Sequence, residues 1–158
     1  SITVSIATGC GTLGGTTTLT TNSNGRVTHT GLNISGTVGT RTLTFASNGL
    51  TSATSNNISI TAGAATQIAI NAGNNQTAVA GAAVATAPSV IVRDANNNPV
   101  AGQTVTFAVA TGGGTITGAT ATTNPQGIAT LGSWTLGTTA GSNTLTATSG
   151  SLTGSPLT

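Results

Sequence analysis

The sequence predicts an all-β protein, an antiparallel β-sandwich whose unit of about 100 residues recurs in tandem. Three observations support this prediction. Short runs place apolar residues at every second position, turn signals such as Asn24-Gly25 and Asn48-Gly49 separate the runs, and long stretches of the sequence repeat. No segment combines a helical period with capping residues. The chain therefore contains strands and turns, with no predicted helix.

The strands are predicted by alternation, because successive side chains of a β-strand point to opposite faces. The first run places Ile2, Val4 and Ile6 on one face. Four further runs alternate in the same way: Leu43 with Phe45, Ile58 with Ile60, Ile68 with Ile70, and Val105 with Phe107 and Val109. Asn98-Pro99 marks a loop before the last of these runs.

The repeat is visible when the two ends of the chain are compared. Residues 2–15, ITVSIATGCGTLGG, match residues 105–118, VTFAVATGGGTITG, 103 positions later. Residues from Gly39, GTRTLTFASNGLT, match GSNTLTATSGSLT from Gly141 at an offset of 102. This offset also pairs His29 with Leu131 and Leu32 with Trp134. One domain type is therefore present about one and a half times.

Composition excludes several classes of function. Charged residues make up 3% of the chain, and they are Arg26, Arg41, Arg93 and Asp94. The three arginines are scattered, whereas nucleic-acid binding needs a clustered basic patch. No apolar run approaches the length of a membrane span. We expect no nucleic-acid partner and no membrane insertion in this segment.

The second copy carries a specific resemblance. The stretch VIVRDANNNPVAGQTVTFAVATGGGTITG, followed by TTNPQGIATL and GTTAGSNTLTATSG, resembles the bacterial Ig-like domain of group 1, the invasin and intimin type. The resemblance implies an Ig-like sandwich strung in tandem on bacterial surfaces, where such repeats serve as rods that carry an adhesive tip. This chain departs from the family in its low content of Lys, Asp and Glu.

The resemblance and the repeat together predict the domain organisation. We expect residues 1–63 to be a truncated Ig-like repeat without its opening strands, and residues 64–158 a second repeat without its last strand. Two explanations stay open for these ends. Either a longer array is cropped at arbitrary points, or a neighbouring chain completes each copy by adding strands. Both predict an assembly longer than this chain.

Cys10 and His29 are the first candidate reactive groups. Cys10 corresponds to Gly113 in the other copy, so the fold does not require its sulfur. A reactive thiolate needs a neighbouring base or a helix N-terminus, and a zinc site needs three or four ligands. We expect Cys10 to be a turn residue, with an interchain disulfide as its remaining chemistry, and His29 to be a strand residue at a packed or edge position.

The other candidates also favour structural roles. Asp94 precedes a turn, where such a side chain commonly accepts hydrogen bonds from nearby backbone N–H groups. The alternative is a Ca²⁺ site built with Asn96, Asn97 and Asn98, which a single carboxylate makes weak. Gly112-Gly113-Gly114 lacks the Lys and the helix of a phosphate loop. We expect Trp134 to fill the core and Arg93 to be solvated.

Together these expectations predict a structural function. We expect no enzyme, and no catalytic, metal or cofactor site. The chain is predicted to be a structural extracellular repeat in the stalk or filament of a bacterial surface protein, with neighbouring copies or adjacent repeats as its partners and strand exchange as one mode of assembly. The alternative is an adhesin domain that itself binds a host, glycan or surface ligand. Exposure of Phe45, Phe107 and Trp134 would favour that alternative.

Overall fold

The computed structural model describes all 158 residues, which form β-strands, turns and loops without a helix. It accordingly contains no long apolar helix of the kind that crosses a membrane. The chain divides into two compact units, Ser1–Ala62 and Gly63–Thr158. This division lies one residue before the predicted boundary. The all-β antiparallel sandwich expected from the alternation is confirmed, and each unit is described below by itself.

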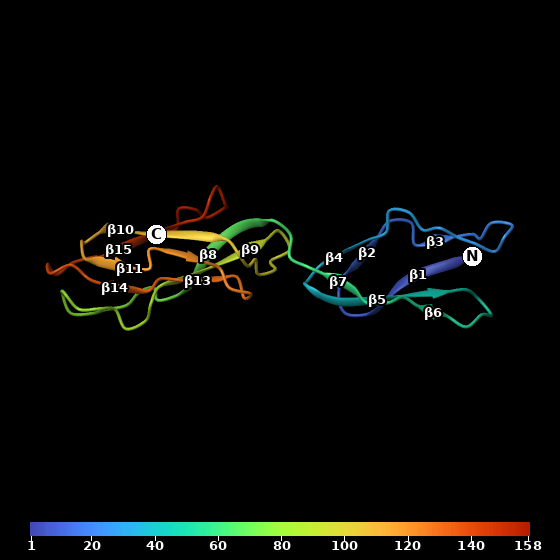
Figure 1. Ribbon diagram of the computed structural model, residues 1–158, viewed down its shortest axis with the longest axis horizontal. Coiled ribbons are helices and arrows are strands. Elements are labelled where there is room, and N and C mark those ends of the chain that lie inside the picture. The colour runs from blue at the N-terminus through green and yellow to red at the C-terminus, as the bar shows by residue number, and fades with distance from the viewer. The chain divides into compact units, whose positions relative to one another are not determined.

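The first unit is built around the antiparallel pair β1 and β5 (Figure 1). The main sheet has the order β3-β1-β5-β6, β7 also pairs with β5, and β2 pairs with β4. The strands are β1 (Ile2–Thr8), β2 (Thr12–Gly14), β3 (Thr18–Leu19), β4 (Asn33–Ser35), β5 (Gly39–Ala46), β6 (Ala53–Thr54) and β7 (Ile58–Ile60).

The second unit has two layers of strands. One is the sheet β12-β10-β15, and the other is the sheet β13-β9-β8. The pair β11-β14 extends the second layer, because β14 directly follows β13 and Val84 N–H donates to the Trp134 carbonyl. The strands are β8 (Ala65–Ala72), β9 (Ser89–Asp94), β10 (Thr104–Thr111), β11 (Thr115–Thr117), β12 (Thr120–Thr122), β13 (Ile128–Thr130), β14 (Ser133–Thr135) and β15 (Thr144–Thr148).

The segment after β15 links the two layers of the second unit. Thr153 pairs with Gln67 of β8, and Leu157 pairs with Ala147 of β15. The Leu157 pair exchanges two backbone hydrogen bonds, of 2.8 and 2.9 Å. In the first unit the equivalent residue of β5, Phe45, pairs with Ala53 of β6. Leu157 therefore occupies the position that β6 occupies in the first unit.

The second unit holds most of the apolar core. Buried side chains come from both layers, so the two sheets face each other across it. Val92, Val105 and Leu131 are the largest fully buried side chains, and Phe107 is 3% exposed. In the first unit only two apolar side chains reach the same depth, Val4 and Leu43. The core thus depends on strands β8 and β9, which have no counterpart in the first unit.

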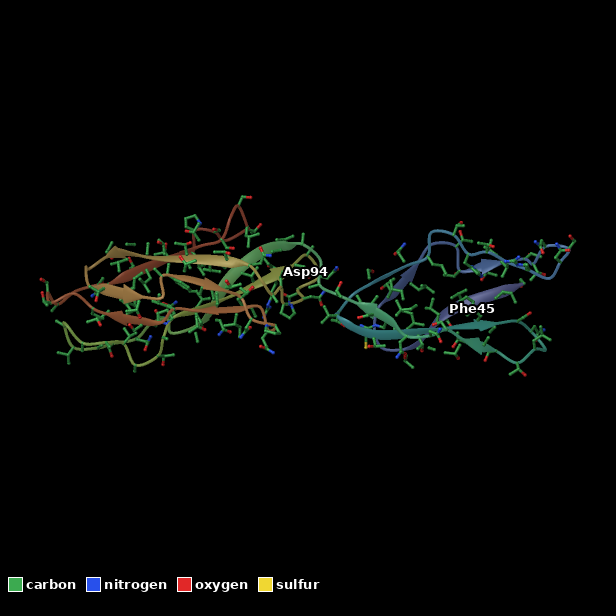
Figure 2. The ribbon with its side chains drawn as sticks, in the orientation of Figure 1. Phe45 and Asp94 are labelled. Atoms are coloured by element: carbon green, nitrogen blue, oxygen red, sulfur yellow. The ribbon has the colours of Figure 1, made fainter.

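The two units place one phenylalanine at the same cross-strand pair but on opposite strands. Val4 of β1 faces Phe45 of β5, whereas Phe107 of β10 faces Ala147 of β15. Each pair thus combines one phenylalanine with one smaller aliphatic side chain. Figure 2 labels Phe45 on its strand, where it is half-buried. The repeat therefore keeps the cross-strand pair, while the aromatic ring lies on β5 in the first unit and on β10 in the second.

Two features of the first unit differ from the prediction. His29 lies in no strand, and neither does any other residue of 20–32. In the second unit the matching residues form β13, which hydrogen-bonds to β9. Because the first unit lacks a β9, its residues 26–28 have no sheet partner and form no strand.

The residue that corresponds to Trp134 also differs. Trp134 pairs with Ile116, and the equivalent pair in the first unit is Ile34 with Leu13. The match of Trp134 with Leu32 was therefore wrong by two residues. The first unit has two more residues between His29 and this strand, and the second has two more between Trp134 and β15, so the offset of 102 is restored.

We predict that Phe107→Ala lowers the free energy of unfolding of the second unit by about 3–5 kcal/mol, since it removes a buried aromatic ring. Denaturant unfolding followed by the emission of Trp134, the only tryptophan, reports on this unit. Phe45→Ala is the matched control, and we expect it to leave the Trp134 transition in place. Equal shifts in both variants would contradict a separate core in the second unit.

Candidate functional site

The turn that contains Cys10 is held by a buried arginine. Arg41 of β5 is 5% exposed. Its Nε donates to the carbonyl oxygen of Cys10, Nη1 donates to that of Thr40, and Nη2 donates to the carbonyl and hydroxyl oxygens of Thr37. One guanidinium thus ties two loops at one end of the first unit. The low charge of the chain gave no sign that one of its arginines is buried.

The turn itself differs between the two copies. Gly113 has a φ of 74°, in the region that favours glycine, whereas Cys10 is not among the residues with positive φ. A Cβ atom on Gly114 would lie 2.2 Å from the carbonyl oxygen of Thr135, so this glycine allows the close approach of β14. The Cys10 thiol is exposed and forms no disulfide. The backbone at Cys10 therefore differs from the backbone at Gly113, which has the left-handed conformation that favours glycine.

His29 replaces a core leucine of the other copy. Its Nδ1 lies 3.0 Å from the carbonyl oxygen of Thr16, and its ring lies 6.2 Å from that of Phe45. Nε2 is buried without a hydrogen-bond partner. The packed position expected for His29 is present, although the residue lies in a loop. Across the whole chain no three His, Cys, Asp or Glu side chains gather in a group that could hold a metal ion.

Asp94, labelled in Figure 2, is the last residue of β9. The side chain is 2% exposed. Oδ1 accepts hydrogen bonds from the backbone N–H groups of Asn96 (2.9 Å) and Asn98 (2.8 Å). Oδ2 accepts from the backbone of Gly63 (2.9 Å) and the side-chain amide of Asn98 (3.0 Å). The predicted turn role of Asp94 is thus present, with the entry to β8 as an additional partner.

These contacts remove the alternative Ca²⁺ site. Both carboxylate oxygens face N–H donors, and Asn96 and Asn98 direct N–H groups rather than oxygens at Asp94. The side-chain oxygen of Asn97 instead accepts a hydrogen bond from Arg93 Nη1 at 2.9 Å. The loop therefore lacks the converging oxygens that Ca²⁺ requires. Arg93 is partly exposed and this hydrogen bond lies at the surface, so the expectation of a solvated Arg93 is not contradicted.

The hydrogen bonds also set the protonation of Asp94. Burial acts to raise the pKa of this carboxyl. Hydrogen bonds from the Asn98 side chain and from the backbone of Gly63, Asn98 and Asn96 outweigh burial and hold the pKa below its ordinary value. The folded state thus favours the ionised carboxylate, which accepts bonds at both oxygens.

The second unit also contains a hollow of about 650 Å³ between its two layers. Its lining includes the buried side chains of Phe107, Trp134 and Val90 and the more exposed ones of Ile70 and Leu145. Trp134 is 8% exposed, and its indole N–H is buried without a hydrogen-bond partner. The prediction that Trp134 fills the core is confirmed. The hollow beside it was not predicted, because no periodicity in the sequence shows where a sheet edge is left uncovered.

The hollow and the sandwich around it belong to the part of the chain that matches a known family. The family described as bacterial Ig-like domain (group 1) matches residues 68–158, which is more than half of the chain. The chain belongs to this family of bacterial Ig-like domains. The family resemblance stated from the sequence is thereby confirmed, and the Ig-like sandwich of the second unit is its fold.

A solved structure is also similar to this Ig-like chain. It is described as the D0-D1 domain of intimin, with 22% sequence identity and a TM-score of 0.43. The similarity covers 96% of this chain and 74% of that one. The search of curated proteins finds no match.

We predict that Asp94→Asn destabilises the second unit by about 2–3 kcal/mol at neutral pH, because the amide cannot accept every bond that the carboxylate accepts. Since the folded pKa is lowered, the wild-type advantage is complete above the ordinary aspartate pKa of about 3.9 and disappears as the pH falls through the folded pKa. Denaturation midpoints from pH 7 to pH 2 measure this. Asp94 is the only acidic side chain, so an unchanged pH profile in the variant would contradict the assignment.

We predict that Arg41→Ala destabilises the first unit by about 2–4 kcal/mol, because it leaves the loop carbonyls without their charged donor. Arg41→Lys restores less than half of the loss, since an ammonium cannot reproduce the planar fork of donors. Unfolding followed by far-ultraviolet circular dichroism measures both. Arg26→Ala, at an exposed position, is the control and changes stability by less than about 0.5 kcal/mol. Equal losses at both positions would show that burial of Arg41 is unimportant.

Proposed function

We propose that this chain is a structural repeat in the stalk or filament of a bacterial surface protein, located outside the cell. Membership of the bacterial Ig-like family supports the proposal. The observation that carries it is the use of the chemically distinctive side chains inside the fold. Asp94 binds a loop, Arg41 binds loop carbonyls, and Phe107 and Trp134 lie in the core. These groups support the architecture and leave no assembled set for catalysis.

The surface composition supports side-by-side or end-to-end association with similar domains. Charged residues make up 3% of the chain, and the exposed positions are mostly Thr, Ser, Asn, Gly and Ala. Soluble β-proteins usually protect sheet edges with charged residues such as Lys, which is absent here. Neutral edges can approach one another at little desolvation cost. The proposed partners are therefore neighbouring copies of the chain or adjacent Ig-like repeats.

The alternative, an adhesin domain that binds a ligand itself, has weaker support. Recognition surfaces usually present exposed aromatic or arginine anchors. Phe107 and Trp134 are buried here and Phe45 is half-buried. The one observation that favours a ligand is the hollow beside Trp134, whose volume lies in the range of about 300–1,000 Å³ typical of binding pockets.

The stalk role can be tested on cells that produce the parent protein. Antibodies against this segment should label intact cells along filaments or stalks, and removal of the segment should shorten those structures. Each shortened filament should still attach cells to a surface as well as a full-length one does, because the proposed adhesive part lies elsewhere. Labelling only after the cells are lysed would overturn the surface location. Loss of attachment with unchanged filament length would favour the adhesin alternative.

A further inference from the structure

We propose that Asn48 is a site of spontaneous covalent modification, at which the folded chain loses ammonia and acquires aspartate and isoaspartate. Asn48-Gly49 is one of two Asn-Gly pairs in the chain, and Asn24-Gly25 is the other. Serine precedes both pairs, so the sequence Ser-Asn-Gly is the same at each. A difference in reactivity between the two pairs in the folded chain therefore comes mainly from the structure. This modification is independent of the proposed stalk role.

The reaction needs only the chain and water. The backbone nitrogen of Gly49 attacks Cγ of Asn48, so that an N–Cγ bond forms and the Cγ–Nδ2 bond breaks. The proton of that nitrogen leaves with the amide group as ammonia, and a five-membered succinimide ring remains. Water then opens the ring, at Cγ to give aspartate or at the backbone carbonyl carbon to give isoaspartate. Glycine favours the attack because it has no Cβ atom beside its nitrogen.

The turn at Asn48 leaves the attacking nitrogen free. Leu50 N–H donates to the Ser47 carbonyl at 3.2 Å, which closes a turn with Asn48 and Gly49 at its centre. Gly49 has a φ of 76° and Asn48 has a negative φ, as in a type II turn. Neither the Gly49 N–H nor the Asn48 side chain makes a hydrogen bond within the chain, and both residues are exposed. The nitrogen, the amide carbon and water can therefore meet.

The loop at Asn24 holds the equivalent nitrogen in place. Gly25 N–H donates to the Asn22 carbonyl at 2.9 Å. Asn22 Oδ1 accepts from the backbone N–H groups of Asn24 and Arg26, both at 3.0 Å. The N–H of Asn22 also donates to the Arg26 carbonyl at 2.7 Å. Attack by the Gly25 nitrogen requires its hydrogen bond to break and its peptide group to turn. Asn24 is therefore protected, although it too is exposed.

The second unit repeats both turns without an Asn-Gly pair. Its loop 124–128 has Gln126 before the glycine, and its turn 149–152 has Gly150 and Ser151 at the centre. A glutamine would have to close a six-membered ring, which forms more slowly than the five-membered ring of asparagine. The fold thus accepts other residues where the first unit has its two reactive asparagines.

Conversion of Asn48 changes the charge of the surface. Asp94 is the only acidic side chain of the chain, and it is 2% exposed. Modification of Asn48 therefore gives the surface its first side-chain carboxylate. The new charge lies in the turn that joins β5 to β6, and β6 is an edge strand of the main sheet. Charges beside an edge strand oppose its pairing with another chain.

The experiment keeps the full folded chain in mildly alkaline buffer and follows both asparagines with time by mass spectrometry of tryptic peptides. Trypsin cleaves after arginine, so Asn24 lies in peptide 1–26 and Asn48 in peptide 42–93. Fragment ions locate the new acid and distinguish isoaspartate from aspartate. We expect Asn48 to convert at least about five-fold faster than Asn24, because the hydrogen bond of Gly25 alone corresponds to about that factor in rate.

Three controls separate structure from local sequence. In denaturant, Asn24 and Asn48 should convert at similar rates, because both follow serine and precede glycine. Asn48→Gln should remove the acid at this position. Asn22→Ala removes two hydrogen bonds of the protected loop, so it should speed conversion of Asn24 in the folded chain and leave Asn48 unchanged. No acid at Asn48, a folded rate ratio no larger than the ratio in denaturant, or an unchanged Asn24 rate in Asn22→Ala would overturn the proposal. None of these outcomes bears on the surface-labelling test of the stalk role.

Discussion

The antiparallel pairing of β10 with β15 is the interaction on which the second unit depends. It aligns Phe107 with Ala147 and places the aromatic ring under the other layer, where Val92 and Leu131 are fully buried. Without that layer the same strand pair is only partly covered. The first unit shows this condition, since its pair β1–β5 leaves Phe45 half-buried. Covering one strand pair with a second sheet therefore makes the difference between a deep core and a shallow one.

Asp94 and Arg41 hold loops in place through hydrogen bonds and form no reactive centre. Asp94 gathers N–H donors from the loop after β9 and from Gly63, and Arg41 gathers carbonyl oxygens from two loops of the first unit. Each of these groups joins segments that are 31 residues apart in the sequence. In a chain with so few charges, the positions of these two side chains are determined by backbone groups and not by oppositely charged partners.

Much of the fold could be predicted from the sequence because alternation and turn residues are local signals. The strands around Val4, Phe45 and Phe107 lie where alternation placed them. The loop at Asp94 could be predicted for the same reason, since an aspartate before a turn bonds to its own backbone. The partner Gly63 is 31 residues away, and no local pattern indicates it.

The errors arose where a structural environment overrides a sequence match. His29 was expected in a strand, but a strand needs a neighbour, and the first unit has no β9 to supply one. Trp134 was matched to Leu32, although cross-strand pairing places Ile34 in its position. The hollow beside Trp134 could not be predicted, because an uncovered edge is a property of the assembled sheets rather than of any one segment.

The manner in which Arg41 and Asp94 are held has a consequence for the environment the protein tolerates. Both charges are balanced at short range by backbone dipoles, carbonyl oxygens for one and N–H groups for the other. Dissolved ions screen interactions between exposed charges over about 10 Å, but they do not reach contacts of this kind. The architecture therefore has little electrostatic energy for salt to screen, so ionic screening by itself changes its stability little between fresh water and brine.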